Sequence, residues 1–227
     1  MKKIFALLLS AALLVTLLAA CGGGNTTDTD TDTQEPAADA STTQVEEQEP
    51  DTGDASKDDP LNQDEIGEKE LLVVSFGTSY NDSRRETIGA IEKAMQTAFP
   101  DYSVRRAFTS QIIIDHVKDR DGVTIDNVEQ ALERAVNNGV KTLVVQPTHL
   151  MNGLEYEELT DELAKYSDSF EKIAIGDPLL TSDADFEAVM TAITDATKDA
   201  ADGKTAICFM GHGTTADSNS VYSKMQT

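Results

Sequence analysis

The chain has 227 residues and carries 41 acidic against 18 basic side chains, which gives a formal net charge of −23 at neutral pH. Binding to a phosphate backbone needs a basic surface, so this charge argues against nucleic acid as a partner. The length allows one domain or two small ones, and the chain holds only two cysteines, Cys21 and Cys208.

The first 21 residues have the order of an export signal. Two lysines form a charged start, and residues 4–20 are apolar apart from two hydroxyl side chains. This run is slightly shorter than the roughly 20 residues of a retained membrane helix, and glycines follow it instead of a basic flank. The sequence "LAAC", residues 18–21, resembles the lipobox of bacterial lipoproteins, which implies cleavage before Cys21 and acylation of its thiol. We therefore expect an extracytoplasmic lipoprotein anchored to the membrane at Cys21.

Residues 22–69 predict a disordered acidic tether. Between Gly22 and Glu70 the chain holds 16 acidic and two basic side chains, a net charge of −14, and almost no aliphatic residues. Such a segment buries too little apolar surface to offset the entropy of ordering it. Residues 71–227 keep a net charge of −11, so the acidity belongs mostly to the tether.

From residue 71 onward, continuous apolar runs alternate with segments of helical spacing. After a polar loop at 78–86, Pro100 is expected to end the first helix, and Thr124 or Asp126 to cap the third, which ends at Gly139. The strands are expected at 71–77, 102–109, 140–148, 170–180 and 204–211, and the helices at 88–99, 110–119, 124–139, 153–166 and 183–200. This alternation predicts an α/β fold with a mostly parallel sheet flanked by helices. Cys208 lies in the last run, where we expect a buried, inert thiol without a disulfide partner.

Ligands bind at the carboxyl ends of the strands in open parallel sheets. Three such ends are rich in polar residues and glycine: "SFGTSYNDS" at 75–83, "QPTHLMNGLEY" at 146–156 and "MGHGTTADSNS" at 210–220. Two of the three histidines of the chain, His149 and His212, lie in these loops. The sequence therefore places its candidate site at this edge of the sheet.

His212 could bind a metal or accept a proton, because a neutral imidazole does both near pH 7. Its flanking glycines, Gly211 and Gly213, would let the backbone approach a flat ligand, although an incidental histidine in a glycine turn has the same pattern. His149 and Glu155 together could bind a divalent cation or share a proton transfer. Each residue also has a structural interpretation. A histidine at a strand end often forms hydrogen bonds only with its own loop, and a glutamate in the first turn of a helix often only complements the helix dipole.

The loop at 75–83 matches no phosphate-binding motif, and the chain has no G-x-S-x-G elbow for a hydrolase. The loop offers hydroxyl groups at Thr78, Ser79 and Tyr80. The following arginines, Arg84 and Arg85, could bind carboxylates or simply face solvent.

The pieces "LLVVSFGTSYNDSRRETIGAIE", "RRAFTSQIIIDHVKDRDGVTIDNVEQALERAVNNGV", "VVQPTHLMNGLEYEEL" and "FMGHGTTADSNSVYSKMQ" resemble the anaerobic-type sirohydrochlorin cobaltochelatases, the CbiK group of class II chelatases. The resemblance covers residues 70–227 in order. It implies insertion of Co²⁺ into sirohydrochlorin, an early step toward cobalamin, with no nucleotide and no permanently bound cofactor. It also implies a fold of two similar α/β halves with the tetrapyrrole between them.

The resemblance assigns roles to individual residues. His212 would be the proton acceptor and a metal ligand, Glu155 would assist at the metal, and His149 would be a further ligand beside the cleft. The loop residues Phe76, Gly77, Thr78 and Ser79 are predicted to contact the substrate.

The resemblance also implies a C-terminal truncation. Residues 70–203 would form the first chelatase-like half, and residues 204–227 only the beginning of the second. We expect such a chain to be a poor chelatase that aggregates or forms homo-oligomers. Because cobalamin is ordinarily built in the cytoplasm, the export signal keeps open an extracytoplasmic lipoprotein that binds tetrapyrrole or metal on the same scaffold, or a purely structural lipoprotein.

Overall fold

The structure is a computed structural model that describes residues 51–226. Contacts divide the chain into two units, Met1–Gln48 and Glu49–Thr227, and the second contains every described residue. The predicted export signal, the acylation of Cys21 and most of the predicted tether lie outside the described residues. Among residues 51–226, no helix is long and apolar enough to cross a membrane.

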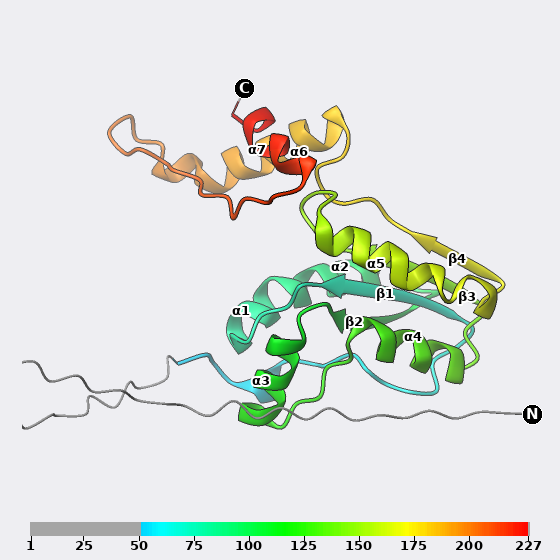
Figure 1. Ribbon diagram of the computed structural model, residues 1–227. Helices are drawn as coiled ribbons and strands as arrows, with labels where there is room; N and C mark the ends of the chain where they lie inside the picture. The colour runs from blue at the N-terminus through cyan, green and yellow to red at the C-terminus, as the bar shows by residue number, and fades with distance from the viewer. Residues whose placement is uncertain (1–50, 227) are drawn as a thin grey trace, which may run out of the picture. The chain divides into compact units, whose positions relative to one another are not determined.

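Four parallel strands form the sheet (Figure 1). They are β1 Lys69–Ser75, β2 Ser103–Phe108, β3 Thr142–Pro147 and β4 Lys172–Ile175, and their spatial order is β2-β1-β3-β4. The helices are α1 Asn81–Glu86, α2 Ile88–Ala98, α3 Gln111–Asp121, α4 Val128–Asn137, α5 Leu154–Ala164, α6 Asp183–Thr197 and α7 Ser220–Lys224. The predicted α/β fold with a parallel sheet is confirmed.

The two faces of the sheet are covered by different helices, because neighbouring side chains of a strand point in opposite directions. Leu72 and Val74 of β1 pack in one core with α4 and α5, whereas Leu71 and Val73 pack in another with Met95 of α2. This double coverage explains why β1 is a continuous apolar run rather than an alternating one.

Local structure differs from the prediction at one helix cap and in one loop. The third predicted helix begins after Asn127 rather than Asp126 or Thr124, and the Asn127 side chain accepts from the Gln130 amide in a reciprocal capping box. Asp126 is not a cap because it is buried as an ion partner of Arg105 and Arg134. The segment 78–86, predicted as a polar loop, contains the helix α1, and Arg84 of this helix is buried.

The last predicted strand is wrong. Residues 204–211 have no regular secondary structure, and the predicted strand at 170–180 is reduced to β4. A strand needs a hydrogen-bonded neighbour, and residues 204–211 pair with none of the four strands of the described sheet. Cys208 is consequently exposed instead of buried, and 67% of Phe209 and 98% of Met210 are accessible to solvent.

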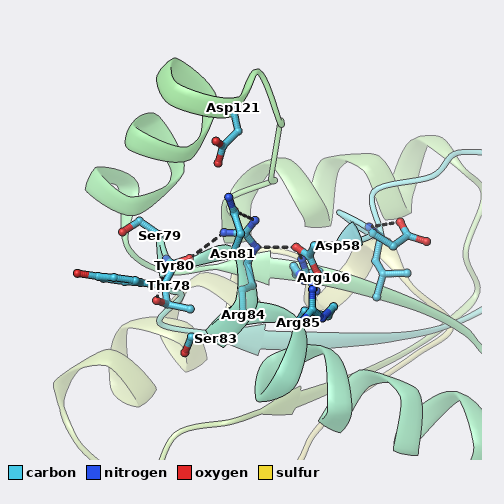
Figure 2. A network of polar contacts seen from close by, with 12 residues as sticks. Asp58, Thr78, Ser79, Tyr80, Asn81, Ser83, Arg84, Arg85, Arg106 and Asp121 are labelled. Atoms are coloured by element: carbon cyan, nitrogen blue, oxygen red, sulfur yellow. Dashed lines mark hydrogen bonds and ion pairs between the residues drawn. The ribbon is translucent and has the colours of Figure 1, made fainter. Parts of the chain in front are cut away.

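The predicted boundary between tether and domain at residue 70 is also wrong. Residues 51–68 are part of the fold: Leu61 and Ile66 are buried, and the Leu61 carbonyl accepts from the Arg106 amide at 3.0 Å. Asp58 binds two buried arginines (Figure 2), accepting from Arg84 Nε at 2.6 Å and from Arg106 Nη1 at 2.7 Å. Composition alone missed this segment because its few buried contacts are isolated in the sequence.

Glu70 at the start of β1 is fully buried, and burial raises its pKa to about 7 although the guanidinium of Arg105, 3.3 Å away, favours the charged form. The folded chain therefore holds a proton that the unfolded chain, with a pKa of 4.5, releases at lower pH. The stability that Glu70 contributes is complete below about pH 4.5 and is lost as pH rises through about 7.

We expect Glu70→Gln to remove this dependence. The difference in unfolding free energy between the native chain and the variant should fall by on the order of 3 kcal/mol from pH 4 to pH 8. Denaturant titrations at several pH values measure it. Parallel stability curves would show that the pKa of Glu70 is the same in the folded and the unfolded chain.

Candidate functional site

The site lies where the sheet topology changes direction. From β1 the chain continues to β2 on one side and later returns to β3 on the other, so the loops after β1 and β3 leave a crevice between them. Phe76 follows β1, and Thr148 and His149 follow β3. The Thr148 hydroxyl donates to the Ser75 hydroxyl at 2.9 Å, which ties the two strand ends together.

A cavity of about 880 Å³ opens at this edge. It is lined by Phe76 after β1, by residues from Thr148 to Glu155 between β3 and α5, and by residues 212–222 near the end of the chain. The lining residues are Phe76, Thr148, His149, Leu150, Met151, Gly153, Leu154, Glu155, His212, Gly213, Thr214, Thr215, Asn219 and Tyr222. His149, Glu155 and His212 therefore open onto the same space.

His149 has an unusual environment for a histidine. Both of its ring nitrogens are buried, and neither has a hydrogen-bond partner among the described residues. Burial lowers the pKa of His149, and the nearby carboxylate of Glu155 only partly opposes this effect. A neutral imidazole with two unoccupied nitrogens can accept a proton or bind a cation. The role of His149 at a metal or in proton transfer stays a prediction.

Glu155 lies in the first turn of α5, two residues after the N-cap residue Gly153. No side chain caps this helix end, so the negative charge of Glu155 complements the helix dipole. The Glu155 side chain is exposed to the cavity. The helix holds it in place because Leu159 and Leu163 are buried in the core.

His212 lies on an exposed turn. Gly213 has a φ of +82°, a left-handed conformation that favours glycine, and its amide donates to the Tyr222 hydroxyl at 3.1 Å. At Gly211, an added Cβ would overlap the ring of Tyr222. These glycines accommodate the chain's own backbone and side chains, whereas the sequence suggested close approach to a ligand.

The predicted metal ligands are brought to one cavity but not into one cluster. Within residues 51–226, no group of three or more His, Cys, Asp or Glu side chains is close enough to hold a metal ion. The ligand set of His149, Glu155 and His212 therefore stays a prediction. A cation here would need further ligands from outside these three side chains.

The predicted substrate loop divides into two parts. Phe76 lines the cavity and is 52% exposed, whereas Gly77, Thr78 and Ser79 do not line it. Gly77 has a φ of +102°, and a Cβ there would overlap the Phe108 ring. Figure 2 shows the loop beside Arg84, which donates to the Thr78 carbonyl at 3.0 Å. The contact of these three residues with substrate stays a prediction, and their contacts here hold the loop in place.

Sequence reasoning missed Leu150, Leu154, Asn219 and Tyr222 as lining residues. The two leucines line the cavity, and 40% of Leu150 and 50% of Leu154 are exposed. Their position after a strand end was the available signal. Tyr222 lies ten residues beyond His212, and only the turn between them brings it back to the site.

Residues 69–227 match the family model described as Cobalt chelatase (CbiK). This chain belongs to that family. As a member of the cobalt chelatase family, it is 38% identical over 145 residues to a sirohydrochlorin cobaltochelatase of Salmonella typhimurium, covering 64% of this chain and 54% of the relative. It is 30% identical over 156 residues to the sirohydrochlorin cobaltochelatase CbiKC of Nitratidesulfovibrio vulgaris, covering 68% and 55%. The chain thus spans about half the length of these curated relatives.

A solved structure described as a candidate cobalamin (vitamin B12) biosynthesis CbiX protein from Marinobacter aquaeolei VT8 also aligns with this cobalt chelatase family member. The TM-score is 0.39 and the sequence identity is 12%, over 58% of this chain and 97% of that one.

Proposed function

We propose that this chain carries the metal-insertion site of a sirohydrochlorin cobaltochelatase, which places Co²⁺ into sirohydrochlorin without nucleotide. The observation that carries the proposal is the single cavity onto which His149, Glu155 and His212 open. Membership of the cobalt chelatase family and the names of the two curated relatives support the choice of metal and macrocycle. Co²⁺ is a substrate in this proposal, and no permanently bound cofactor takes part.

Insertion requires that the cation lose water, that two pyrrole N–H protons leave and that the macrocycle nitrogens be accessible. A neutral His149 and the exposed His212 are the candidate proton acceptors, and Glu155 supplies negative charge for the cation. Exposed apolar side chains, Phe76 and Leu154 among them, offer a surface on which a flat macrocycle can pack. The cavity therefore combines polar groups for the reaction with apolar walls for the substrate.

The test is to mix the full chain, solubilised in detergent, with metal-free sirohydrochlorin and Co²⁺ and to follow the absorption spectrum. Insertion changes the macrocycle bands progressively and catalytically. An immediate change that stops at one equivalent would contradict insertion and favour a tetrapyrrole- or metal-binding lipoprotein on this scaffold. No change at all would contradict both.

We also propose that the protein is an extracytoplasmic lipoprotein, anchored to the membrane through acylated Cys21. The charged start, the apolar run and the "LAAC" sequence support this location. Self-association belongs to the same proposal, because Phe209 and Met210 expose apolar surface that a second copy could cover.

Cys21→Ser is expected to abolish lipid attachment. In a bacterial host that processes lipoproteins, the unsubstituted chain should incorporate labelled palmitate and enter the detergent phase, whereas the variant should do neither. The matched control is Cys208→Ser, which removes the exposed thiol of the folded part and should keep the label. Labelling that survives Cys21→Ser would place the anchor elsewhere.

A further inference from the structure

Residues 211–222 form a small unit in which a short helix holds the turn that carries His212. The helix is α7, which begins directly after Asn219. Two side chains one helical turn apart, Asn219 and Tyr222, accept hydrogen bonds from two successive amides of the turn. Gly213 donates to the Tyr222 hydroxyl at 3.1 Å, and Thr214 donates to Asn219 Oδ1 at 3.2 Å.

The Tyr222 ring packs against Gly211, the residue before His212. A Cβ on Gly211 would overlap this ring, so the residue before His212 has room only for a hydrogen at that position. The Tyr222 hydroxyl at the same time binds the amide of the residue after His212. One side chain thus contacts the backbone on both sides of the histidine.

The helix that presents Tyr222 is itself attached to the fold. Lys224 in the last turn of α7 forms an ion pair with Asp183 at the start of α6, and its ammonium group lies 4.1 Å from the centroid of the Phe186 ring. Tyr222 is half-buried and lines the cavity beside His212. The turn is therefore braced by a helix with its own contacts to α6.

From these contacts we propose that Tyr222 is a positioning residue for His212: its hydroxyl and ring fix the turn so that the imidazole points into the cavity. The proposal rests on the proposed function only in naming insertion as the reaction that benefits. It also explains the pattern Gly-His-Gly in this chain. Gly211 makes room for the Tyr222 ring, and Gly213 adopts the left-handed conformation that brings its amide to the Tyr222 hydroxyl.

The first experiment uses Tyr222→Phe in the full chain, solubilised in detergent. This variant keeps the ring and removes only the acceptor for the Gly213 amide. Hydrogen exchange of that amide, followed by NMR, should become about three- to tenfold faster, the effect of losing one net hydrogen bond. For insertion, kcat should fall by about the same factor while KM for the macrocycle stays unchanged, because the cavity wall is intact. Tyr166→Phe, which alters a tyrosine packed against the core and outside the cavity, is the matched control.

The second experiment tests the ring contact without any substrate. Gly211→Ala should speed exchange of the Thr214 amide in the native background, because the new methyl group displaces the Tyr222 ring and with it the start of α7, where Asn219 accepts from this amide. In a Tyr222→Ala background the same substitution should add nothing. Equal effects of Gly211→Ala in both backgrounds, or unchanged Gly213 exchange in Tyr222→Phe, would overturn the proposal. If the native chain inserts no cobalt, the proposed function fails, and these exchange measurements still decide the role of Tyr222.

Discussion

Asp58→Ala is expected to lower the free energy of unfolding by about 3–5 kcal/mol, the usual cost of removing one partner from a buried ion pair. The Asp58 carboxylate accepts from Arg84 Nε at 2.6 Å and from Arg106 Nη1 and Nη2 at 2.7 and 3.1 Å. Both arginine side chains are 1% exposed or less. Burial disfavours ionisation of Asp58, but the hydrogen bonds from Arg106 and Arg84 outweigh it and hold its pKa below the usual value.

The loss is large because the two guanidinium groups stay buried in the variant. Glu92 remains as a partner of Arg106, at 2.6 Å. Arg84 keeps hydrogen bonds only to neutral groups, the side-chain oxygen of Asn81 and the carbonyl of Thr78, besides a weak attraction to the charge of Asp121. A buried charge without an opposite charge is the costly arrangement. Since the pKa of Asp58 is lowered in the fold, its contribution is present above about pH 3.8 and is lost as pH falls below that value.

Glu68→Ala is the matched control. Glu68 lies in the same segment and pairs with Lys141 at 2.6 Å, but the two side chains are 67% and 48% exposed. Exposed pairs contribute about 0–1 kcal/mol, so denaturant titrations should show a small change for this variant. Equal effects of the two substitutions would contradict the buried network. A fragment that starts at residue 70, as the composition suggested, lacks Asp58 and should be destabilised at least as strongly as the point variant.

Much of the fold could be predicted because its signal is local. A run such as 71–74, apolar at every position, predicts a strand covered on both faces, and Leu159 and Leu163 mark the buried face of a helix. Asp58 could not be predicted in the same way. It is one of many acidic residues in a polar segment, and only pairing with residues 26 and 48 positions away distinguishes it from its neighbours.

In the candidate site, too, local sequence signals could be predicted and features that depend on distant contacts could not. Strand ends with histidines indicated where His149 and His212 would lie, and both line the cavity. The last strand failed because an apolar run becomes a strand only beside a neighbour, and residues 204–211 have none in the described sheet. Tyr222 could not be predicted as a site residue, because its contact with the Gly213 amide depends on the shape of a turn that composition does not reveal.

His212→Ala is expected to reduce the rate of cobalt insertion by about 10²- to 10⁴-fold, the usual contribution of a general acid or base. Glu155→Gln should also slow insertion, through weaker attraction of the cation, while leaving the fold intact because Glu155 is exposed at the first turn of α5. Initial rates from the absorption of the macrocycle measure both effects. Binding of the macrocycle, followed by quenching of protein fluorescence without metal, should change little in either variant.

His116→Ala is the matched control, since His116 is an exposed histidine of α3 that does not line the cavity. Its insertion rate should equal that of the native chain.

His149→Ala distinguishes two roles of His149, proton transfer and binding of the cation. If His149 shares proton transfer, its loss should lower kcat, because burial keeps its imidazole neutral and able to accept a proton at neutral pH. If it only binds the cation, its loss should raise KM for Co²⁺ instead. A rate unaffected by His212→Ala and His149→Ala together would remove imidazole from the reaction and leave Glu155 alone to act on the cation.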